Sequence, residues 1–575
     1  MVSESAIVRS TKYGRNIFPD LEESAEIHSL IFKYPTVYIV NDKEGQGRGL
    51  FDVYVGETND IKNRTNQHLQ DTRDDWKKFG ESGTAELIVM GHPHFNKSLT
   101  LDIENKMRLY MTGVESVNHL NNRRGNPQGD YYTSNEVDTV FDELWIELHN
   151  LNKKLFPNRA EVEQSAMFKS SPFHRLTEEQ IENKNYLMLN IRKAMKESLS
   201  QQLMIVEGAA GTGKTVLLSS LFFDFLAENI GEDGRLKKRV ALLVNHDEQV
   251  KVYRSIGAKL GIKDINDVVM KPNPFINRYH DKMDEFDAVI VDEGHLLANR
   301  NGQAFKKAYG KTHLEAIRKI ARVTVLVYDP YQVLKTEQRL PQKQLDELRQ
   351  EVKEAGHLLT LHHQMRINAQ QQTIDWLDDL IHKHQVNPIP KDSKYDLKVF
   401  DSATALDSAI RLKAKQEDSE LSRVLATYDW EWKPDGREYK VTDGNFSKPW
   451  NYYLTNQNEH VSWAENPKSI DEVGSTFTIQ GFDLNYAGVI IGESVQYRGG
   501  KIVFNPKNSF SKKATNKMGE SSGATPEERL SARIKNLNNE LNVLLSRGVN
   551  GLYIYAVDPE LQAVLMKAYA NKNMD

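Results

Sequence analysis

The sequence contains no cysteine, and this excludes several kinds of site at once. Without thiols there are no disulfides, no thiolate zinc sites and no cysteine nucleophile, so a bound metal needs oxygen or imidazole ligands. Long apolar runs are also missing: none approaches the roughly 20 residues that cross a bilayer, and residues 1–15 lack an apolar signal core. We therefore expect a cytoplasmic protein that does not associate with membranes.

The sequence has no excess of positive charge. The formal net charge is −5 over 575 residues, so the surface as a whole does not attract nucleic acid by charge alone. Any nucleic-acid binding must therefore be local. Hydrophobic residues make up 39% and charged residues 27%, as in ordinary globular proteins. At roughly 100 to 200 residues per domain, the length predicts about three or four domains.

Short apolar runs in the middle of the chain have the pattern of parallel strands that are buried on both faces. They lie at 203–206, 240–244, 288–291 and 323–328. Helical patterns between these runs predict a doubly wound α/β core. A second α/β domain is predicted by similar runs at 423–427, 486–491 and 551–557.

The segment from Gly208 to Thr215 reads G-A-A-G-T-G-K-T and matches G-x-x-x-x-G-K-[ST] between a strand-like run and a helical run. Glycines, here also at Gly211 and Gly213, permit backbone conformations closed to other residues and leave amide groups facing phosphates, as a helix N-terminus also does. Lys214 is expected to meet the β- and γ-phosphates of ATP, and the Thr215 hydroxyl to ligate Mg²⁺.

Asp292 and Glu293 follow the run at 288–291, and so stand at the carboxyl end of a predicted strand, where α/β sheets place ligands. Asp292 is suited to hold hydrated Mg²⁺, and Glu293 to orient or activate the attacking water. Together with the loop from Gly208 to Thr215, this pair predicts an ATP-hydrolysis site.

From about residue 170 to residue 570 the chain resembles superfamily 1 helicases, and more closely the prokaryotic helicase-like ATPases related to the helicase part of Schlafen proteins. The resemblance rests on the two phosphate motifs and on five weaker segments that follow the family's order. These are L-T-E-E-Q ending at Gln180, D-P-Y-Q ending at Gln332, H-H-Q-M-R ending at Arg366, S-T-F-T-I-Q-G with Gln480 and Gly481, and L-L-S-R ending at Arg547.

This resemblance implies roles for those residues. Gln180 would read adenine, Gln332 would sense the γ-phosphate, and Gln480 with Gly481 would belong to the nucleotide site. Arg366 and Arg547 would supply positive charge from the second lobe, so that hydrolysis is coupled to lobe closure.

Two departures from the helicase pattern weaken the prediction of strand separation but not the prediction of ATP hydrolysis. The second phosphate motif ends in Gly-His295 where many helicases have x-Gln. The stretch from Thr215 to Asp292 also leaves little room for the accessory domain that large DNA helicases insert there.

The first 133 residues hold a second set of candidate residues. Tyr38 and Tyr54 lie in consecutive strand-like segments, within T-V-Y and Y-V-G. Arg64 and His68 follow, four residues apart and on one face of a predicted helix. Glu104 lies in a second helical pattern and is a carboxylate suited to a hard divalent cation. Each residue alone is more often a core residue or part of a solvated face.

In this order the residues resemble the GIY-YIG nuclease family over about 100 residues, although Thr36 replaces the first glycine of the motif. The family's closing asparagine is matched by Asn118, with Asn121 or Asn122 as alternatives. The resemblance implies that Tyr38 or His68 deprotonates a water, that Arg64 stabilises charge on the phosphate, and that Mg²⁺ on Glu104 supports the leaving oxygen.

Domain boundaries follow from these patterns and resemblances. We expect an N-terminal extension at 1–33, a GIY-YIG nuclease-like domain at 34–133, a helical connector at 134–172, and RecA-like domains at 173–365 and 366–575. The fold class is thus α/β, with a small mixed α/β domain followed by two doubly wound parallel-sheet domains. A mobile insert is expected at 506–525, where Lys, Ser, Asn and Gly are frequent.

The two sites together predict an ATP-dependent enzyme whose ATPase moves or remodels nucleic acid and whose N-terminal domain cuts it, in defence against phage or in DNA repair. One alternative is a nucleotide-gated nuclease or binding switch that does not unwind strands, and another is a protein-remodelling ATPase. ATP and Mg²⁺ are the expected cofactors, and DNA rather than RNA is the expected partner. A homo-oligomer or an additional protein partner is left open.

Aromatic residues provide one further candidate. Tryptophans cluster in the second α/β region, where they suit a platform on which bases stack, although such residues more often belong to a core. They are Trp430, Trp432, Trp450 and Trp463.

Overall fold

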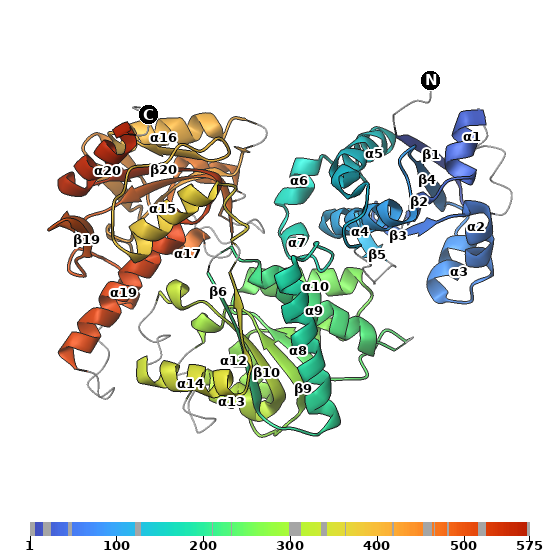
Figure 1. The fold of residues 1–575 in the computed structure, drawn as a ribbon, viewed down its shortest axis with the longest axis horizontal. Coiled ribbons are helices and arrows are strands. Elements are labelled where there is room, and N and C mark those ends of the chain that lie inside the picture. Colours follow the sequence, from blue (N-terminus) through green and yellow to red (C-terminus); the bar gives the residue numbers. More distant parts are fainter. Residues whose placement is uncertain are drawn as a thin grey trace. The chain divides into compact units, whose positions relative to one another are not determined.

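The computed structural model divides into two compact units (Figure 1). Unit 1 holds 1–204, 215–292 and 315–326, and unit 2 holds 205–214, 293–314 and 327–575. The described residues are 6–14, 25–43, 49–120, 128–209, 211–231, 233–297, 312–334, 342–362, 364–416, 419–451, 463–464, 466–479, 482–515 and 525–571. Within these ranges, no helix combines the length and the apolar composition needed to cross a membrane.

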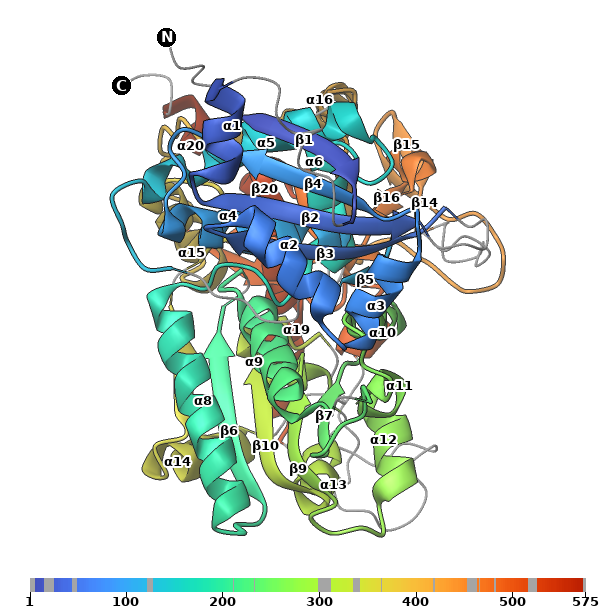
Figure 2. The ribbon, with the colours of Figure 1, turned by 90° about the vertical axis from the view of Figure 1, so that its right-hand side faces the viewer.

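A five-stranded mixed sheet forms the N-terminal part of unit 1, with strand order β1-β4-β2-β3-β5. Figure 2 shows the strands side by side in this order. Their bounds are β1 Ile7–Lys12, β2 Thr36–Lys43, β3 Phe51–Thr58, β4 Glu86–Gly91 and β5 Val117–Leu120. The antiparallel β2–β3 register sets Tyr38 opposite Gly56 and Val40 opposite Tyr54. The two strand-like segments predicted around Tyr38 and Tyr54 therefore lie within β2 and β3.

Strand β1 lies in the segment that we expected to be an extension. It pairs antiparallel with β4 along its whole length, from Ile7 opposite Gly91 to Lys12 opposite Glu86. An edge strand of this kind needs only one apolar face, and Ile7 and Tyr13 supply it to the core beneath. The polar residues that alternate with them hide the strand from a sequence pattern based on apolar runs.

Helices around this sheet carry the candidate residues. Their bounds are α1 Ala25–Phe32, α2 Ile61–Gln70, α3 Asp74–Glu81, α4 Lys97–Gly113, η2 Ser134–Glu136, α5 Val137–Leu151, α6 Arg159–Gln164 and α7 Ala166–Lys169. Side-chain oxygens start the two helices of interest, because Asp60 accepts from the Asn63 amide and Asn96 from the Leu99 amide. Helix α2 presents Arg64 and His68, and the largely buried α4 presents Glu104.

The middle of the chain contains a six-stranded sheet with order β11-β6-β10-β9-β7-β8. Its strands are β6 Gln202–Gly208, β7 Val240–Leu243, β8 Val269–Met270, β9 Phe286–Val291, β10 Ala321–Tyr328 and β11 Leu358–Leu361. The helices are α8 Glu178–Lys196, α9 Lys214–Asn229, α10 Asp247–Lys259, α11 Ile265–Val268, α12 Pro272–Tyr279, α13 His313–Ile320 and α14 Gln342–Glu354. The predicted parallel, doubly wound core is confirmed by the parallel pairing of β9 with β7 and β10.

A second parallel sheet lies in unit 2, with order β12-β20-β17-β13-β16. Its strands are β12 Asp396–Val399, β13 Ser422–Ala426, β16 Val473–Gly474, β17 Leu484–Ile491 and β20 Gly548–Ala556. Helices α15 Gln371–His382, α16 Ala403–Lys413, α17 Thr476–Ile479, α18 Lys512–Thr515, α19 Pro526–Leu545 and α20 Pro559–Asn571 accompany it. The hairpins are β14 Lys440–Asp443 with β15 Phe446–Pro449, and β18 Val495–Arg498 with β19 Lys501–Phe504. This sheet confirms the second predicted α/β domain.

Two expectations change in this region. The segment expected to be a mobile insert holds α18 at Lys512–Thr515, and its residues 516–524 lie outside the described residues. Trp450 and Trp463 are buried in the hydrophobic cores, so they cannot form a stacking platform. Trp430 and Trp432 are partly buried against the same core as Trp450.

Candidate functional site

The loop after β6 folds around the side chain of Lys214. The Lys214 ammonium donates to the carbonyl oxygens of Gly208 and Ala209, both at 2.7 Å. Gly211 and Gly213 have positive φ values of 84° and 75°. A Cβ at Gly211 would lie 2.6 Å from the Cβ of Arg366, and glycine alone avoids this clash. The loop therefore depends on glycine at position 211, and its binding of phosphate stays a prediction.

Asp329 joins this loop to the motif that ends at Gln332. Its Oδ2 lies 3.1 Å from the Lys214 Nζ and accepts a hydrogen bond from the Gln332 amide at 2.7 Å. Burial raises the pKa of the Asp329 carboxyl, but the positive charge of Lys214 and the hydrogen bonds more than offset this, and the net shift is downward. Asp329 stays ionised and anchors Lys214. Sequence reasoning did not assign it a role, although it directly follows β10 as Asp292 follows β9.

Glu293 and His295 lie in the segment after β9. Glu293 has a left-handed backbone with φ 52°, a conformation that costs a non-glycine residue energy and that is enriched at functional sites. The His295 ring is buried, with its Nε2 3.4 Å from Glu293 Oε2. Burial lowers the pKa of His295, so the ring is neutral beside the carboxylate. Asp292 is buried, its amide donates to the Leu243 carbonyl, and Thr215 lies in the first turn of α9.

Arg366 and Arg547 meet at one carboxylate, Asp483. The Arg366 Nε lies 2.8 Å from Asp483 Oδ1, and the Arg547 Nη1 lies 3.9 Å from the same oxygen. Burial, with the nearby charge of Arg366, lowers the pKa of Arg547 to about 10. The charges of Glu293 and Asp329 also act on Arg547. The two predicted arginines therefore lie together near the acidic residues of the loop site.

Helix α19 connects Arg547 to the segment of Gln332. The Asn539 amide donates to the Val333 carbonyl at 2.9 Å, and the Asn542 amide donates to the Tyr331 carbonyl at 3.2 Å. The helix ends two residues before Arg547, whose Nε donates to the Val543 carbonyl. A movement of Arg547 therefore strains the segment that contains Gln332, and a movement of that segment strains Arg547. Gln480 and Gly481 lie outside the described residues.

Gln180 closes the start of α8. Its side-chain oxygen accepts from the Thr177 amide at 3.0 Å, and the Thr177 hydroxyl accepts from the Gln180 amide at 3.3 Å, which is a capping box. Gln180 is buried. The T-E-E-Q sequence thus has a structural explanation, and adenine reading by Gln180 stays a prediction.

Tyr38, His68 and Arg64 form a hydrogen-bonded cluster in the N-terminal part of unit 1. The Arg64 Nε donates to the Tyr38 hydroxyl oxygen at 3.3 Å, so that hydroxyl directs its proton to His68 Nε2, 2.8 Å away. Tyr38 and His68 are 1% and 3% exposed. Burial, and then the charge of Arg64, lowers the pKa of His68 to about 3, while burial raises the pKa of Tyr38. The imidazole is therefore neutral and can accept the hydrogen bond of the Tyr38 hydroxyl, and Tyr38 resists ionisation.

Stacking fixes the orientation of the imidazole. The His68 ring lies 3.6 Å from the Trp76 ring, nearly parallel at 17°. The Tyr54 ring packs against the rings of both His68 and Trp76. Burial raises the pKa of Tyr54, which opposes its ionisation as well. Trp76 was missed in the sequence because α3 lies outside the motif.

Glu104 approaches the cluster from α4. It is buried, and its negative charge raises the pKa of Tyr38 and of Tyr54. One helical turn later, Arg108 is 1% exposed and donates from Nη2 to Asn105 Oδ1 at 3.0 Å. The charges of Glu104 and Tyr54 act on Arg108. Arg108 therefore balances the charge of Glu104, and nothing in the sequence singled it out.

Asn118 does not join the hydrogen bonds of that cluster. Its side-chain amide donates to Asp52 Oδ1 at 3.3 Å, and Asp52 also pairs with Lys78. Asn121 and Asn122 lie outside the described residues. In the part of the chain that the structure describes, no three His, Asp or Glu side chains converge as metal ligands. Glu104 can thus offer Mg²⁺ only a single protein carboxylate, and the assignment of Asp292 and Thr215 as oxygen donors for the ion stays a prediction.

Lys259 anchors the far end of α4. Its ammonium, 8% exposed, donates to the Thr112 carbonyl at 3.1 Å and the Val114 carbonyl at 2.7 Å. A cation suits the negative end of a helix dipole. Burial nevertheless lowers the pKa of Lys259 to about 8. The helix that carries Glu104 is therefore attached at its C-terminus to α10, in the middle part of the chain.

This attachment predicts a specific pH dependence. Because the folded pKa of Lys259 lies near 8 and its ordinary value is 10.5, the unfolded chain binds more protons between these values, and folding stability rises with pH there. Urea unfolding of the parent and of Lys259→Met is expected to show this rise only in the parent. At pH 7 the variant loses the two hydrogen bonds but also the cost of burying an ammonium, so the slope of stability with pH, and not the stability at one pH, is the readout. Lys251→Met, at an exposed position of α10, is the matched control. Parallel pH profiles in all three proteins would refute the prediction.

Comparison with known proteins assigns the family. The model of Schlafen group 3, DNA/RNA helicase domain matches residues 201–558. The uncharacterized protein YPL245W of Saccharomyces cerevisiae is 32% identical over 411 residues, covering 67% of this chain and 88% of the relative. The Pif1 helicase of Candida albicans is 15% identical with a TM-score of 0.18, over 42% of this chain and 54% of that one, about half its length, and such a score supports no conclusion. Because the family match spans more than half of the chain, the protein belongs to the Schlafen group 3, DNA/RNA helicase domain family.

Proposed function

We propose that this protein hydrolyses ATP to move along or remodel nucleic acid, DNA in preference to RNA, and that its N-terminal domain cuts the same strand. The observation that carries the proposal is the charge network around Lys214. Asp329 and Gln332 hold one side of it, and the arginine pair on Asp483 supplies cations near the same acidic residues. Membership of a helicase domain family supports a nucleotide-hydrolysing enzyme.

In this proposal the phosphates of ATP replace Asp329 and the loop carbonyls as partners of Lys214. Thr215 and Asp292 hold Mg²⁺, which when bound neutralises phosphate charge. Glu293 orients the attacking water. Arg366 and Arg547 exchange Asp483 for the γ-phosphate, which draws in the lobe that carries them. Gln332 and α19 convey that movement. Gln332 donates to Asp329, and Asn542 of α19 donates to the Tyr331 carbonyl in the same segment.

The N-terminal domain is proposed to cleave through a proton relay. A water gives its proton to the Tyr38 hydroxyl as that hydroxyl passes its own proton to His68 Nε2, so the positive charge ends transiently on the His68 imidazolium and Tyr38 does not become a free phenolate. Arg64 stabilises the charge that develops on the phosphate. Glu104 holds the metal ion, which supplies charge neutralisation at the leaving oxygen when bound. We keep the domain limits 34–133, 173–365 and 366–575, a cytoplasmic location and a role in defence or repair as parts of the proposal.

The test of the ATPase is hydrolysis measured with Mg²⁺-ATP against single-stranded, duplex and forked DNA and RNA, with cleavage products followed in parallel. Stimulation of at least about tenfold by one class of nucleic acid is expected, since lobe closure assembles the site. Hydrolysis that is indifferent to every nucleic acid would overturn the proposal. It would favour a protein-remodelling ATPase.

A nucleotide-gated switch is the second candidate, and the attachment of α4 favours it. Lys259 ties the helix of Glu104 to the ATPase core, so nucleotide binding alone can act on the N-terminal domain. Under this alternative, nucleic-acid binding requires ATP but survives Glu293→Gln, which blocks hydrolysis. Demonstrated strand displacement that depends on hydrolysis would exclude it.

A further inference from the structure

Arg108 is a buried arginine of α4, one helical turn after Glu104. Its Nη2 donates to Asn105 Oδ1 at 3.0 Å, and its guanidinium lies 5.4 Å from the centre of the Phe173 ring, which is within the range of a cation–π contact. The negative charge of Glu104 acts on it. Because Phe173 lies outside α4, a displacement of its ring changes the surroundings of the cation that balances Glu104.

Phe173 belongs to a short, internally bonded segment between α7 and α8. The Ser171 amide donates to the Phe168 carbonyl at 3.0 Å, and the Phe173 amide donates to Ser171 Oγ at 3.3 Å. The ring of His174 donates from Nε2 to the same Phe168 carbonyl at 2.7 Å. These bonds tie residues 168–174 together, so Phe173 moves with its neighbours rather than alone.

Helix α9 holds this segment in place. The buried Ser219 hydroxyl of α9 donates to the Ser170 carbonyl at 2.6 Å. Ser219 lies four residues after Thr215, so it stands one helical turn beyond the loop from Gly208 to Thr215. A shift at the start of α9 is therefore passed to Ser170 and to the residues that are bonded behind it.

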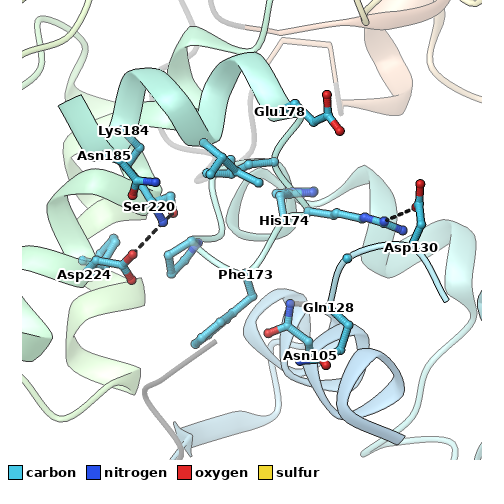
Figure 3. Close-up of a pocket in the computed structure, with 16 residues that line it drawn as sticks. Asn105, Gln128, Asp130, Phe173, His174, Glu178, Lys184, Asn185, Ser220 and Asp224 are labelled. Carbon is cyan, nitrogen blue, oxygen red and sulfur yellow. Dashed lines mark hydrogen bonds and ion pairs between the residues drawn. The ribbon is translucent and has the colours of Figure 1, made fainter. Parts of the chain in front are cut away.

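A cavity of about 380 Å³ gives Phe173 room to move. Figure 3 shows Phe173 and Asn105 among the side chains that line it, and the ion pair of Lys184 with Asp224 joins α8 to α9 at the same cavity. The buried Arg108 lies behind this wall. Close-packed surroundings resist displacement, so the cavity is the side toward which the Phe173 ring can withdraw from Arg108.

We propose that Arg108 is a positioning residue for Glu104, and that α9 sets the position of Arg108 through Phe173. The inference rests on the proposed function, which makes ATP phosphate the ligand of the loop before α9 and places Glu104 in the cleavage cluster. It adds the path between the two sites, which runs from α9 through residues 170–173 to α4.

Nucleotide binding acts on this path before any hydrolysis takes place. The phosphates draw Lys214 from its present partners and so shift the start of α9, which carries Ser219. Residues 170–174 follow, and the Phe173 ring withdraws into the cavity. Arg108 then loses its ring contact, and the charge balance at Glu104 changes. A nucleotide that is bound but not hydrolysed is therefore expected to change the rate of cleavage.

The experiment measures hydrogen–deuterium exchange of α4 in the full chain, with and without a saturating non-hydrolysable ATP analogue and Mg²⁺. In the parent the analogue should speed exchange at residues 104–112 by at least about threefold, because the helix opens more readily once the ring has left Arg108. Phe173→Leu should exchange equally fast in both conditions. Phe173→Tyr keeps the ring and should restore the difference.

Phe223→Leu is the matched control for Phe173→Leu. Phe223 lines the same cavity with nearly the same exposure, 4% against 5%, but its ring packs against Phe222 and Tyr253. It should show the analogue-dependent exchange of the parent. The cleavage rate with the analogue, divided by the rate without it, should differ from one by at least about threefold in the parent and in the control. The ratio should be one in Phe173→Leu.

The role of Arg108 itself is tested by two substitutions. Arg108→Lys keeps the charge beside Glu104 but loses the planar group that packs on the ring. It should cut nucleic acid within about tenfold of the parent and lose the exchange difference. Arg108→Met should lose cleavage as well. If Arg108→Met does not fold, the comparison of Arg108→Lys with the parent decides, since equal exchange differences in the two would overturn the role.

The outcomes separate this inference from the proposed function. Binding of the analogue with no change in α4, or the same change in the parent and in Phe173→Leu, overturns the coupling even where ATP hydrolysis is normal. A Phe173-dependent change in α4 of a protein that cuts no nucleic acid upholds the coupling and overturns the proposed nuclease.

Discussion

Replacing Lys214 with alanine is expected to lower kcat for ATP hydrolysis by roughly 10³-fold, because the ammonium is the cation that the loop directs at the transferring phosphate. Its three contacts, to Gly208, Ala209 and Asp329, hold it at the centre of the loop. The measurement is the steady-state rate of phosphate release at saturating ATP and nucleic acid. Lys251→Ala, an exposed lysine of α10, should retain the rate of the parent.

The alanine variant leaves the buried carboxylate of Asp329 without its cation, so a loss of folding has to be separated from a loss of catalysis. The double variant Lys214→Ala with Asp329→Ala removes both charges and is expected to unfold at nearly the temperature of the parent. Its hydrolysis should be as low as that of Lys214→Ala. A folded double variant that hydrolyses ATP at the rate of the parent would show that Lys214 is not part of the catalytic site.

Local sequence could predict the glycine backbone of the loop from Gly208 to Thr215, because that conformation depends on consecutive residues. The positions of Gly211, Gly213 and Lys214 are fixed by the backbone that joins β6 to α9, and the structure shows the conformations which that pattern requires. The same reasoning found the parallel strands, because a strand buried on both faces must be apolar throughout. The fold class and the order of the elements followed from these two features.

Contacts between distant segments were out of reach. Asn539 and Val333 are 206 residues apart, and neither an asparagine in a helix nor a valine in a loop signals a partner. Arg108 looks like any polar residue of α4 until the fold surrounds it. Asn118 was predicted to act with Tyr38 and His68. Strand β5 pairs with β3 in a register in which the Asn118 amide reaches Asp52 instead. The pairing register of the strands decides such contacts, and a short sequence motif does not specify that register.

The substitution Tyr38→Phe is the most direct test of the proposed cleavage by the cluster of Tyr38, His68 and Arg64, because it removes one oxygen and keeps the ring. The hydroxyl is the link between Arg64 and His68, so cleavage is expected to fall by roughly 10²- to 10⁴-fold while ATP hydrolysis is unchanged. Tyr34→Phe, at a tyrosine with 42% exposure, is the matched control. Cleavage is measured on labelled DNA with Mg²⁺ and without ATP.

The lowered pKa of His68 adds a second readout to the same experiment. Since that pKa is about 3, the imidazole is neutral throughout the working range, and the parent's cleavage rate should show no titration of His68 between about pH 5 and pH 8. Glu104→Ala should lose the dependence on Mg²⁺ concentration together with the activity, whereas Glu115→Ala, at an exposed position just after α4, should keep both. If Glu104→Ala or Tyr38→Phe cuts as fast as the parent, Tyr38, His68 and Glu104 are a buried core cluster, and the N-terminal domain binds nucleic acid without cutting it.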